Sequence, residues 1–154
     1  MSQIVTIVDY RAGNLTSVQL AVEKLGQTAL ITDDPEEVRS ATRLIFPGVG
    51  AAEAAMDTLR SGGLDKAIAD YAATGRPMLG ICLGAQIILE FSEEGDVQCL
   101  GLVPGRVERL EVPAGVKVPH MGWNQVTFVQ PHPLWNGRRS GKPDLRGGKV
   151  RGAA

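Results

Sequence analysis

Short apolar runs alternate with longer mixed stretches through the first hundred residues of the chain. A short run of apolar, partly β-branched residues is typical of a buried strand. Four such runs are present, at residues 4–8, 29–31, 44–46 and 77–81. In the stretches between them, apolar spacing, capping residues and glycine stops predict helices. These helices are expected at residues 15–25, from 33–37 onward, and at 51–59, 64–73 and 85–91.

The order of these elements, strand and helix in turn, predicts an α/β fold. The predicted strands are apolar throughout rather than alternating, which favours an open, mostly parallel sheet flanked by helices on both faces. After Gly101 the pattern changes to shorter extended pieces, expected at 103–112, 116–119 and 125–129. No internal repeat or linker divides the chain, and we expect one domain over residues 1–137.

The composition excludes several classes of protein. Of the 154 residues, 44% are apolar and 21% are charged, as in a soluble globular domain. No apolar stretch approaches the roughly 18 residues that a membrane span needs, and the start lacks the pattern of a secretory signal. We therefore expect a cytoplasmic protein that contacts no membrane. Its two cysteines, Cys82 and Cys99, do not make a disulfide framework and are expected to be thiols.

The net charge of −1 hides an uneven distribution. Residues 138–154 contain six basic residues and one acid, which leaves ten basic and sixteen acidic residues in the rest of the chain. Leu145 and Val150 are the only large apolar residues of this basic tail. A packed structure is therefore not expected there, and the tail is predicted to be disordered. A basic arm for nucleic acid or a membrane is the alternative interpretation.

The sequence Gly80-Ile81-Cys82-Leu83-Gly84 lies between a predicted strand and a predicted helix. It has the Gly-x-nucleophile-x-Gly pattern of a nucleophile elbow, in which glycines make room for a strained nucleophile backbone. The thiol of Cys82 would then lie at a helix N-terminus, where the dipole favours the thiolate. The Leu83 N–H would face the developing oxyanion. The alternative is a buried core cysteine beside two packing glycines.

Two further loops follow predicted strands, at the edge where an open parallel sheet binds ligands. The glycines of Pro47-Gly48-Val49-Gly50 would let a backbone N–H turn toward a substrate oxyanion; the alternative is a plain strand-to-helix turn. The loop at 9–14 has a single glycine, which does not support a dinucleotide fingerprint. Gln86 lies one helical turn after Cys82 and is either a substrate contact or an ordinary surface residue.

His120 and His132 are the only histidines and hence the only candidates for a histidine base. Neither has a nearby carboxylate that would orient it, which is more typical of structural histidines. The spacing of Cys82, Cys99 and the histidines does not fit a zinc site. We expect no metal and no cofactor.

Taken together, these motifs resemble the family of glutaminase subunits of imidazole glycerol phosphate synthase, a branch of the class I glutamine amidotransferases. The resemblance covers about residues 4–137, and residues 118–124 discriminate best, since other amidotransferases share the elbow. The matching segments are 8–10 with 12–15, 47–50, 80–84 with Gln86, 92–94, 100–102 and 118–124. The fold that the resemblance implies is flavodoxin-like.

The resemblance also implies a mechanism and a partner. Cys82 would attack the side-chain amide of glutamine, ammonia would leave, and a glutamyl thioester would be hydrolysed to glutamate. The ammonia would pass through a tunnel to a (β/α)8-barrel cyclase subunit, the partner in a heterodimer. That subunit would make imidazole glycerol phosphate and an aminoimidazole carboxamide ribotide in histidine biosynthesis. The implied site consists of the oxyanion residues Val49, Gly50 and Leu83, the glutamine contacts Gln86 and Glu94, and the partner-facing residues Asn14, Met121, Trp123 and Asn124.

The chain departs from the family pattern in three ways. Arg11 stands where the family usually has glycine, and Ala85 where it usually has methionine. The family's catalytic histidine and glutamate lie in a His-Pro-Glu motif, which the 154 residues do not contain; residues 132–134 match a different segment. We therefore expect a truncated or frame-shifted product after Gly137, with the C-terminal strands missing and negligible activity. The alternatives are a non-catalytic remnant that only binds the cyclase subunit, and a cysteine hydrolase of related fold with another base.

Overall fold

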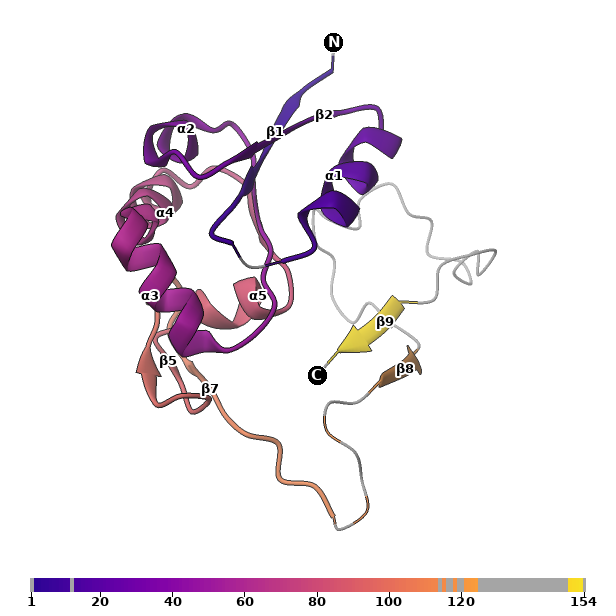
Figure 1. The fold of residues 1–154 in the computed structure, drawn as a ribbon, viewed down its shortest axis with the longest axis vertical. Coiled ribbons are helices and arrows are strands. Elements are labelled where there is room, and N and C mark those ends of the chain that lie inside the picture. The colour runs from indigo at the N-terminus through magenta and orange to yellow at the C-terminus, as the bar shows by residue number, and fades with distance from the viewer. Residues whose placement is uncertain are drawn as a thin grey trace. The chain divides into compact units, whose positions relative to one another are not determined.

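The computed structural model describes residues 2–11, 13–113, 115, 118, 121–124 and 150–153. The chain forms two compact units, Met1–Arg109 and Leu110–Ala154 (Figure 1). The first unit contains the helices and the larger sheet, and it holds most of the residues predicted to form a site. Among the described helices, none combines the length and the apolar character that a membrane span requires.

The first unit is built on a four-stranded sheet whose strands follow the four apolar runs of the sequence. In spatial order the strands are β2 (Thr28–Thr32), β1 (Ile4–Val8), β3 (Leu44–Phe46) and β4 (Met78–Gly80). All neighbouring pairs are parallel. The carboxyl ends of these strands therefore meet at one edge, where an open α/β sheet places its ligand sites. The predicted parallel sheet is confirmed.

Five helices accompany this sheet in the described residues. They are α1 (Leu15–Lys24), α2 (Pro35–Ser40), α3 (Ala52–Gly62), α4 (Leu64–Ala73) and α5 (Leu83–Ile87). The start of α2 is as predicted: Pro35 is the first helical residue, and the Asp34 carboxylate accepts a hydrogen bond from the Glu36 N–H at 2.8 Å. Such a cap satisfies a backbone donor that the first helical turn leaves open.

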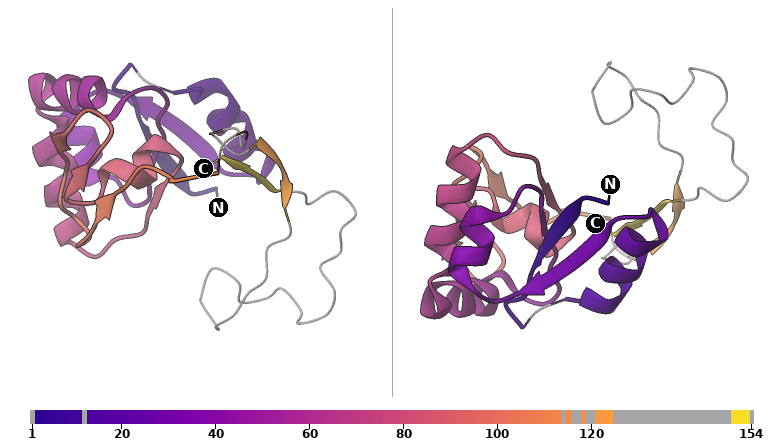
Figure 2. Two further views of the ribbon diagram at one scale, coloured as in Figure 1. Left: turned by 90° about the horizontal axis from the view of Figure 1, so that it is seen from below. Right: turned by 90° about the horizontal axis from the view of Figure 1, so that it is seen from above.

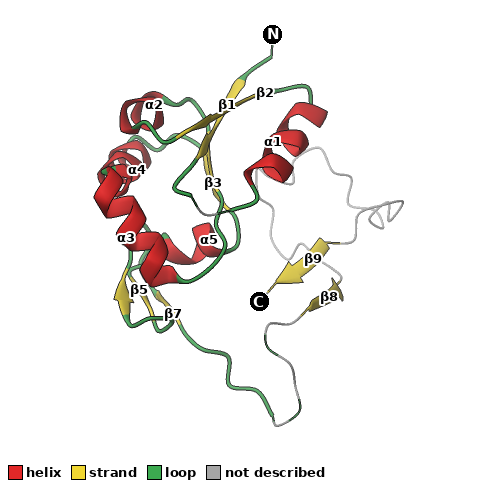
Figure 3. Ribbon diagram, viewed as in Figure 1, coloured by secondary structure: helices red, strands yellow, loops and turns green. Residues whose placement is uncertain are grey.

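The core has two parts, one on each face of the sheet. On one face, Val5 and Ile7 of β1 pack with Val22 of α1. On the other face, sheet residues such as Val8 and Phe46 pack with apolar residues of α2, α3, α4 and α5. Figures 2 and 3 show α1 on the opposite side of the sheet from α3 and α4. The prediction of a sheet covered on both faces is therefore confirmed.

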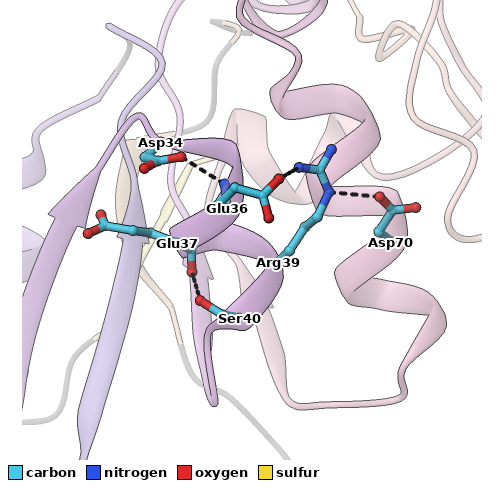
Figure 4. Close-up of polar contacts among 6 residues, drawn as sticks. All are labelled: Asp34, Glu36, Glu37, Arg39, Ser40 and Asp70. Carbon is cyan, nitrogen blue, oxygen red and sulfur yellow. Dashed lines mark hydrogen bonds and ion pairs between the residues drawn. The ribbon is translucent and has the colours of Figure 1, made fainter.

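Polar contacts join α2 to α4 at the surface (Figure 4). The Arg39 guanidinium lies 2.5 Å from a carboxylate oxygen of Glu36 and 2.9 Å from one of Asp70. Both carboxylates are exposed, and solvent screens such pairs strongly. This network therefore orients the two helices more than it stabilises them.

Arg76, which lies between α4 and β4, makes a more buried connection to the end of α2. Its guanidinium donates to the carbonyl oxygens of Ala41 and Arg39, the latter at 2.5 Å. It also lies over the ring of Tyr71, 4.6 Å from the ring centroid. Because these carbonyls belong to the last turn of α2 and its cap, Arg76 satisfies acceptors that the helix end leaves open.

Replacing Arg76 with alanine is expected to lower the free energy of unfolding by about 2 kcal/mol, since a hydrogen bond from a charged donor contributes about 1.5–3 kcal/mol. Arg76→Lys keeps the charge and loses the planar fork, so it should recover only part of this loss. Urea unfolding of the three proteins measures the difference. An alanine variant as stable as the parent chain would show that Arg76 does not support the end of α2.

The helix after Cys82 is shorter than the predicted 85–91. The helix α5 begins at Leu83 and ends at Ile87. Beyond it, the Ile88 carbonyl accepts the Leu102 N–H at 2.8 Å and the Val103 N–H at 3.1 Å. These bonds to a later segment replace the bonds that would continue the helix, and sequence spacing alone does not reveal them.

The chain continues from α5 into a small three-stranded sheet in the order β6-β5-β7. Its strands are β5 (Phe91–Ser92), β6 (Val97–Gln98) and β7 (Arg106–Val107). Strand β5 pairs antiparallel with β6 and parallel with β7. Within the extended piece predicted at 103–112, only β7 is a regular strand.

The second unit contains, in its described part, strand β8 (Met121–Asn124) paired antiparallel with β9 (Val150–Ala153). Strand β9 lies in the basic tail, residues 138–154, for which the sequence predicts disorder. The described residues do not include 125–129 or 138–149. Of the extended piece predicted at 116–119, they include only Val118. The division between the units falls after Arg109, and the domain bounds 1–137 and 138–154 stay predictions.

Candidate active site

Cys82 occupies a sharp turn between β4 and α5. Its backbone angles are φ 54° and ψ −120°, and its side chain is exposed. A positive φ is uncommon for a residue other than glycine, and holding one in such a sparsely populated region costs about 1–3 kcal/mol. Hydrogen bonds hold the turn on both sides: the Ile81 N–H donates to the Phe46 carbonyl at 3.0 Å, and the Ala85 N–H to the Cys82 carbonyl at 2.9 Å. The predicted strained elbow is therefore present.

The two glycines of the elbow are required by their surroundings. A Cβ on Gly84 would lie 2.0 Å from the carbonyl oxygen of Phe46. A Cβ on Gly80 would lie 2.8 Å from the Cα of Ala85. Both clashing atoms belong to the backbone, so a change of side-chain rotamer cannot relieve either clash. The glycines thus allow α5 to start directly against β3 and β4, and this places Cys82 at the edge of the sheet.

The loop 47–50 follows β3 and lies against this elbow. A Cβ on Gly48 would lie 2.8 Å from the nitrogen of Gly84 and 2.9 Å from the Cβ of Leu83. Pro47 and Gly48 are buried, whereas Val49 is 53% exposed and Gly50 has a φ of 96°. The structure therefore brings the predicted oxyanion loop next to the nucleophile turn. The oxyanion role of its N–H groups stays a prediction.

Tyr10 is a site residue that sequence reasoning missed. It follows β1, is 2% exposed, and donates its hydroxyl proton to the Pro47 carbonyl at 2.8 Å. Burial, and secondarily the negative charge of the Cys82 thiolate, raise the pKa of the Tyr10 hydroxyl well above its usual range. In the loop at 9–14, the sequence indicates a site only at the glycine and, by resemblance, at Asn14. The signal that could have found Tyr10 is an aromatic residue with a polar tip directly after a buried strand.

Gln86 and Glu94, the predicted glutamine contacts, lie after Cys82 on separate elements. Gln86 is half-buried on α5, and its backbone N–H donates to the Cys82 carbonyl at 3.2 Å. Glu94 is exposed in the turn between β5 and β6, where its N–H donates to the Oγ of the buried Ser92 at 3.2 Å. Their contact with glutamine stays a prediction.

The predicted partner-facing residues come from both units. In the first unit, the Asn14 side chain accepts the Ser17 N–H at 3.2 Å and caps α1. In the second unit, Met121, Trp123 and Asn124 lie on β8. A role for these residues toward a partner stays a prediction.

Neither histidine can be placed in the site. His120 and His132 both lie outside the described residues. Within the part of the chain that the structure describes, no three His, Cys, Asp or Glu side chains group as metal ligands do.

The second thiol, Cys99, differs from Cys82 in its surroundings. It is half-buried, and its Sγ lies 3.6 Å from the Val97 carbonyl oxygen. Burial raises the pKa of the Cys99 thiol, and the charge of Arg60 opposes this only in part. Because the thiolate is the reactive form of cysteine, Cys99 is expected to be the slower of the two toward electrophiles.

The sequence model of the glutamine amidotransferase class-I family matches residues 3–143, and the chain belongs to this family. Its relatives include the imidazole glycerol phosphate synthase subunit HisH of Moorella thermoacetica, 52% identical over 134 residues, which are 86% of this chain and 63% of that protein. The same subunit of Nitrosococcus oceani is 52% identical over 136 residues, 86% of this chain and 65% of that protein. The chain thus spans less than two thirds of the length of these curated relatives.

Solved structures support the fold at lower identity. A crystal structure of a glutamine amidotransferase is 19% identical with a TM-score of 0.57, over 77% of this chain and 62% of that one. A putative peptidase E of Listeria monocytogenes is also 19% identical, with a TM-score of 0.55 over 66% of this chain and 63% of that one. The predicted class I glutamine amidotransferase fold is confirmed.

Proposed function

We propose that the chain is the glutamine amidotransferase subunit of imidazole glycerol phosphate synthase. The observation that carries this is the exposed, strained Cys82 at a strand-to-helix turn, in a chain that is 52% identical to proteins named as that subunit. The subunit acts in the cytoplasm in a heterodimer with a (β/α)8-barrel cyclase subunit. Ammonia from glutamine reaches the cyclase, which forms imidazole glycerol phosphate and an aminoimidazole carboxamide ribotide in histidine biosynthesis.

In the proposed reaction, the Cys82 sulfur attacks the side-chain carbonyl carbon of glutamine. The carbonyl oxygen becomes an oxyanion, which the N–H groups of Leu83 and of the loop 47–50 stabilise. The C–N bond breaks, ammonia leaves after gaining a proton, and a glutamyl thioester remains on Cys82. Water then attacks the thioester carbonyl and releases glutamate with the free thiol. Gln86 and Glu94 contact the amino acid part of glutamine.

A second candidate function is binding without catalysis. The 154 residues contain no His-Pro-Glu motif, and by resemblance this motif supplies the base and its orienting carboxylate. A chain of this sequence would then only bind the cyclase subunit. Only the first candidate requires a glutamine site at Cys82, so the binding of glutamine is tested first.

Glutamine chloromethyl ketone, in which CH2Cl replaces the side-chain NH2 of glutamine, is expected to alkylate Cys82 selectively. The sulfur displaces chloride to form a thioether, and the thiol proton passes to water, so no general acid is required. Glutamine present at about ten times its Kd should slow the reaction about tenfold by mass action. Peptide mass mapping locates the adduct, and its rate of appearance gives the protection.

The chain offers two controls for this labelling. Asparagine, which is one methylene shorter than glutamine, should protect far less, and Cys99 should react slowly with or without glutamine. Alkylation of Cys82 that glutamine does not slow would show a reactive thiol without a glutamine site, and it would overturn the proposed function.

A further inference from the structure

We propose that Tyr10 is a positioning residue whose hydroxyl holds the loop 47–50 in place against the turn at Cys82. This inference rests on the proposed function, because it takes Val49 and Gly50 of that loop as oxyanion residues. Tyr10 lies on a different strand end from both the loop and the nucleophile, so it can connect them only through its side chain.

The side chain of Tyr10 is fixed at both of its ends. Its ring lies against the ring of Phe46, with the centroids 5.4 Å apart and the planes tilted by 48°. Its hydroxyl donates to the Pro47 carbonyl at 2.8 Å. Because Phe46 ends β3 and Pro47 begins the loop, the tyrosine spans the point where the strand gives way to the loop.

The hydroxyl reaches the loop where the loop touches the elbow. A Cβ on Gly48 would lie 2.3 Å from the Tyr10 hydroxyl oxygen and 2.8 Å from the Gly84 nitrogen. The space above the Gly48 Cα is therefore closed by the tyrosine on one side and by the start of α5 on the other. The loop is thus held between Tyr10 and the helix that follows Cys82.

The surroundings keep this hydroxyl a donor. Burial, and less strongly the charge on Cys82, raise the pKa of Tyr10, so the hydroxyl keeps its proton at every pH at which the protein would work. The Pro47 carbonyl lies in a buried residue. Without the hydroxyl, this buried acceptor would lose its partner, which costs about 1–3 kcal/mol.

Holding the Pro47 carbonyl has a consequence for the residues that follow. A peptide unit is planar, so fixing the Pro47 carbonyl oxygen also fixes the direction of the Gly48 N–H and the position of the Gly48 Cα, from which the chain continues to Val49. Oxyanion stabilisation depends on donors that are already oriented before charge develops. Loss of the Tyr10 hydroxyl should therefore loosen the donors of the loop while leaving the thiol itself unchanged.

The chain supplies a closely matched control in Tyr71. Tyr71 is also fully buried, and its hydroxyl donates to the Pro77 carbonyl at 2.6 Å, before the start of β4. Tyr10→Phe and Tyr71→Phe thus remove the same atom from the same kind of hydrogen bond. Both should lower stability, Tyr71→Phe by less because the Pro77 carbonyl keeps the Leu44 N–H as a second donor at 3.1 Å, and only Tyr10→Phe should disturb the site.

The first measurement is the backbone 15N order parameter of residues 48–50 in the two variants and the parent chain. In the parent chain and in Tyr71→Phe we expect values near about 0.85, typical of rigid backbone, and in Tyr10→Phe a fall toward about 0.6. Unchanged order parameters in Tyr10→Phe would overturn the inference, because the loop would then be held without the hydroxyl.

The second measurement is the rate of Cys82 alkylation by two reagents. With glutamine chloromethyl ketone, whose carbonyl oxygen the loop donors would hold while the sulfur displaces chloride, Tyr10→Phe should react about tenfold more slowly, less than the 10²–10³ lost when an oxyanion donor is removed outright. With iodoacetamide, which does not depend on those donors, the rate should stay within about twofold, and Tyr71→Phe should match the parent chain with both reagents.

The outcomes separate this inference from the proposed function. If the parent chain shows no protection by glutamine, the proposed function fails and the inference fails with it. If the parent chain is protected and Tyr10→Phe reacts with the ketone as fast as the parent, only the inference is overturned. A slowing that Tyr71→Phe shares would also overturn it, because general destabilisation would then be the cause.

Discussion

Purified as 154 residues and mixed with the cyclase subunit, the chain is expected to bind that subunit and to release no ammonia from glutamine above background. Binding is expected because residues 118–124, which resemble the family most specifically, are all present. The absence of turnover is expected because the sequence contains no His-Pro-Glu motif. Residues 118–124 and the lack of a His-Pro-Glu motif thus lead to opposite expectations for binding and for catalysis.

The size of this effect follows from the steps that need a base. The amide nitrogen must gain a proton before it leaves, and the water that cleaves the thioester must lose one. General acid–base help contributes about 10²–10⁴ in rate, and removing one member of a catalytic unit often costs nearly as much as removing all of them. A thiol at an intact elbow therefore does not by itself give turnover.

Glutamate formation in the presence of the cyclase subunit measures the activity, and co-elution on size exclusion measures the binding. The imidazole glycerol phosphate synthase subunit HisH of Moorella thermoacetica, assayed in the same way, is the positive control. Cys82→Ser is the matched negative control, since it keeps the turn and removes the thiol. Glutamate release at a rate typical of enzymes, and lost in Cys82→Ser, would refute the prediction and would require a base elsewhere in the chain.

The parallel sheet and the elbow could be predicted from sequence because each has a strong local signal. The runs at 4–8 and 44–46 are apolar without alternation, which a strand buried on both faces requires. At Gly80 and Gly84, the residue types are set by contacts with backbone only a few residues away or on the adjoining strand. The boundaries of these elements follow closely because turn glycines and prolines mark them.

The features that escaped prediction depend on contacts between distant segments. The helix predicted to reach residue 91 ends at Ile87 because the backbone of Leu102 and Val103 bonds to the carbonyl of the next residue, Ile88. The hydroxyl of Tyr10 acts on a carbonyl 37 residues away. Neither contact leaves a periodic pattern in the sequence. The role of Glu94 rests on resemblance alone, and that of Gln86 on resemblance and on its place one helical turn after Cys82.

Gly84→Ala is expected to destabilise the first unit by more than about 3 kcal/mol, at the upper end of the cost of overpacking a core. The added Cβ would lie 2.0 Å from the Phe46 carbonyl oxygen, 2.8 Å from the Phe46 carbonyl carbon and 3.1 Å from the Pro47 carbonyl oxygen. The strain cannot be relieved by a rotamer change. Either β3 or the start of α5 must move, and both movements would disturb the turn at Cys82.

Gly62→Ala is the matched control, because it adds the same methyl group where space exists. Gly62 is the last residue of α3, and the nearest atoms to an added Cβ are side-chain atoms of Leu64 at 3.9 Å. Alanine in a helix is favoured over glycine by about 0.5–1 kcal/mol, so this variant should equal or exceed the parent chain in stability.

Thermal unfolding of the two variants, with iodoacetamide alkylation of Cys82 in the folded state, tests both parts of this argument. A stability of Gly84→Ala within about 0.5 kcal/mol of the parent, the size of an ordinary surface effect, would mean that α5 does not pack against β3 as closely as the structure has it. The expected result is that Gly84→Ala is destabilised and alters the alkylation rate at Cys82, whereas Gly62→Ala shows neither change. This would show that Gly84, which lets α5 pack on the sheet, also sets the position of the nucleophile.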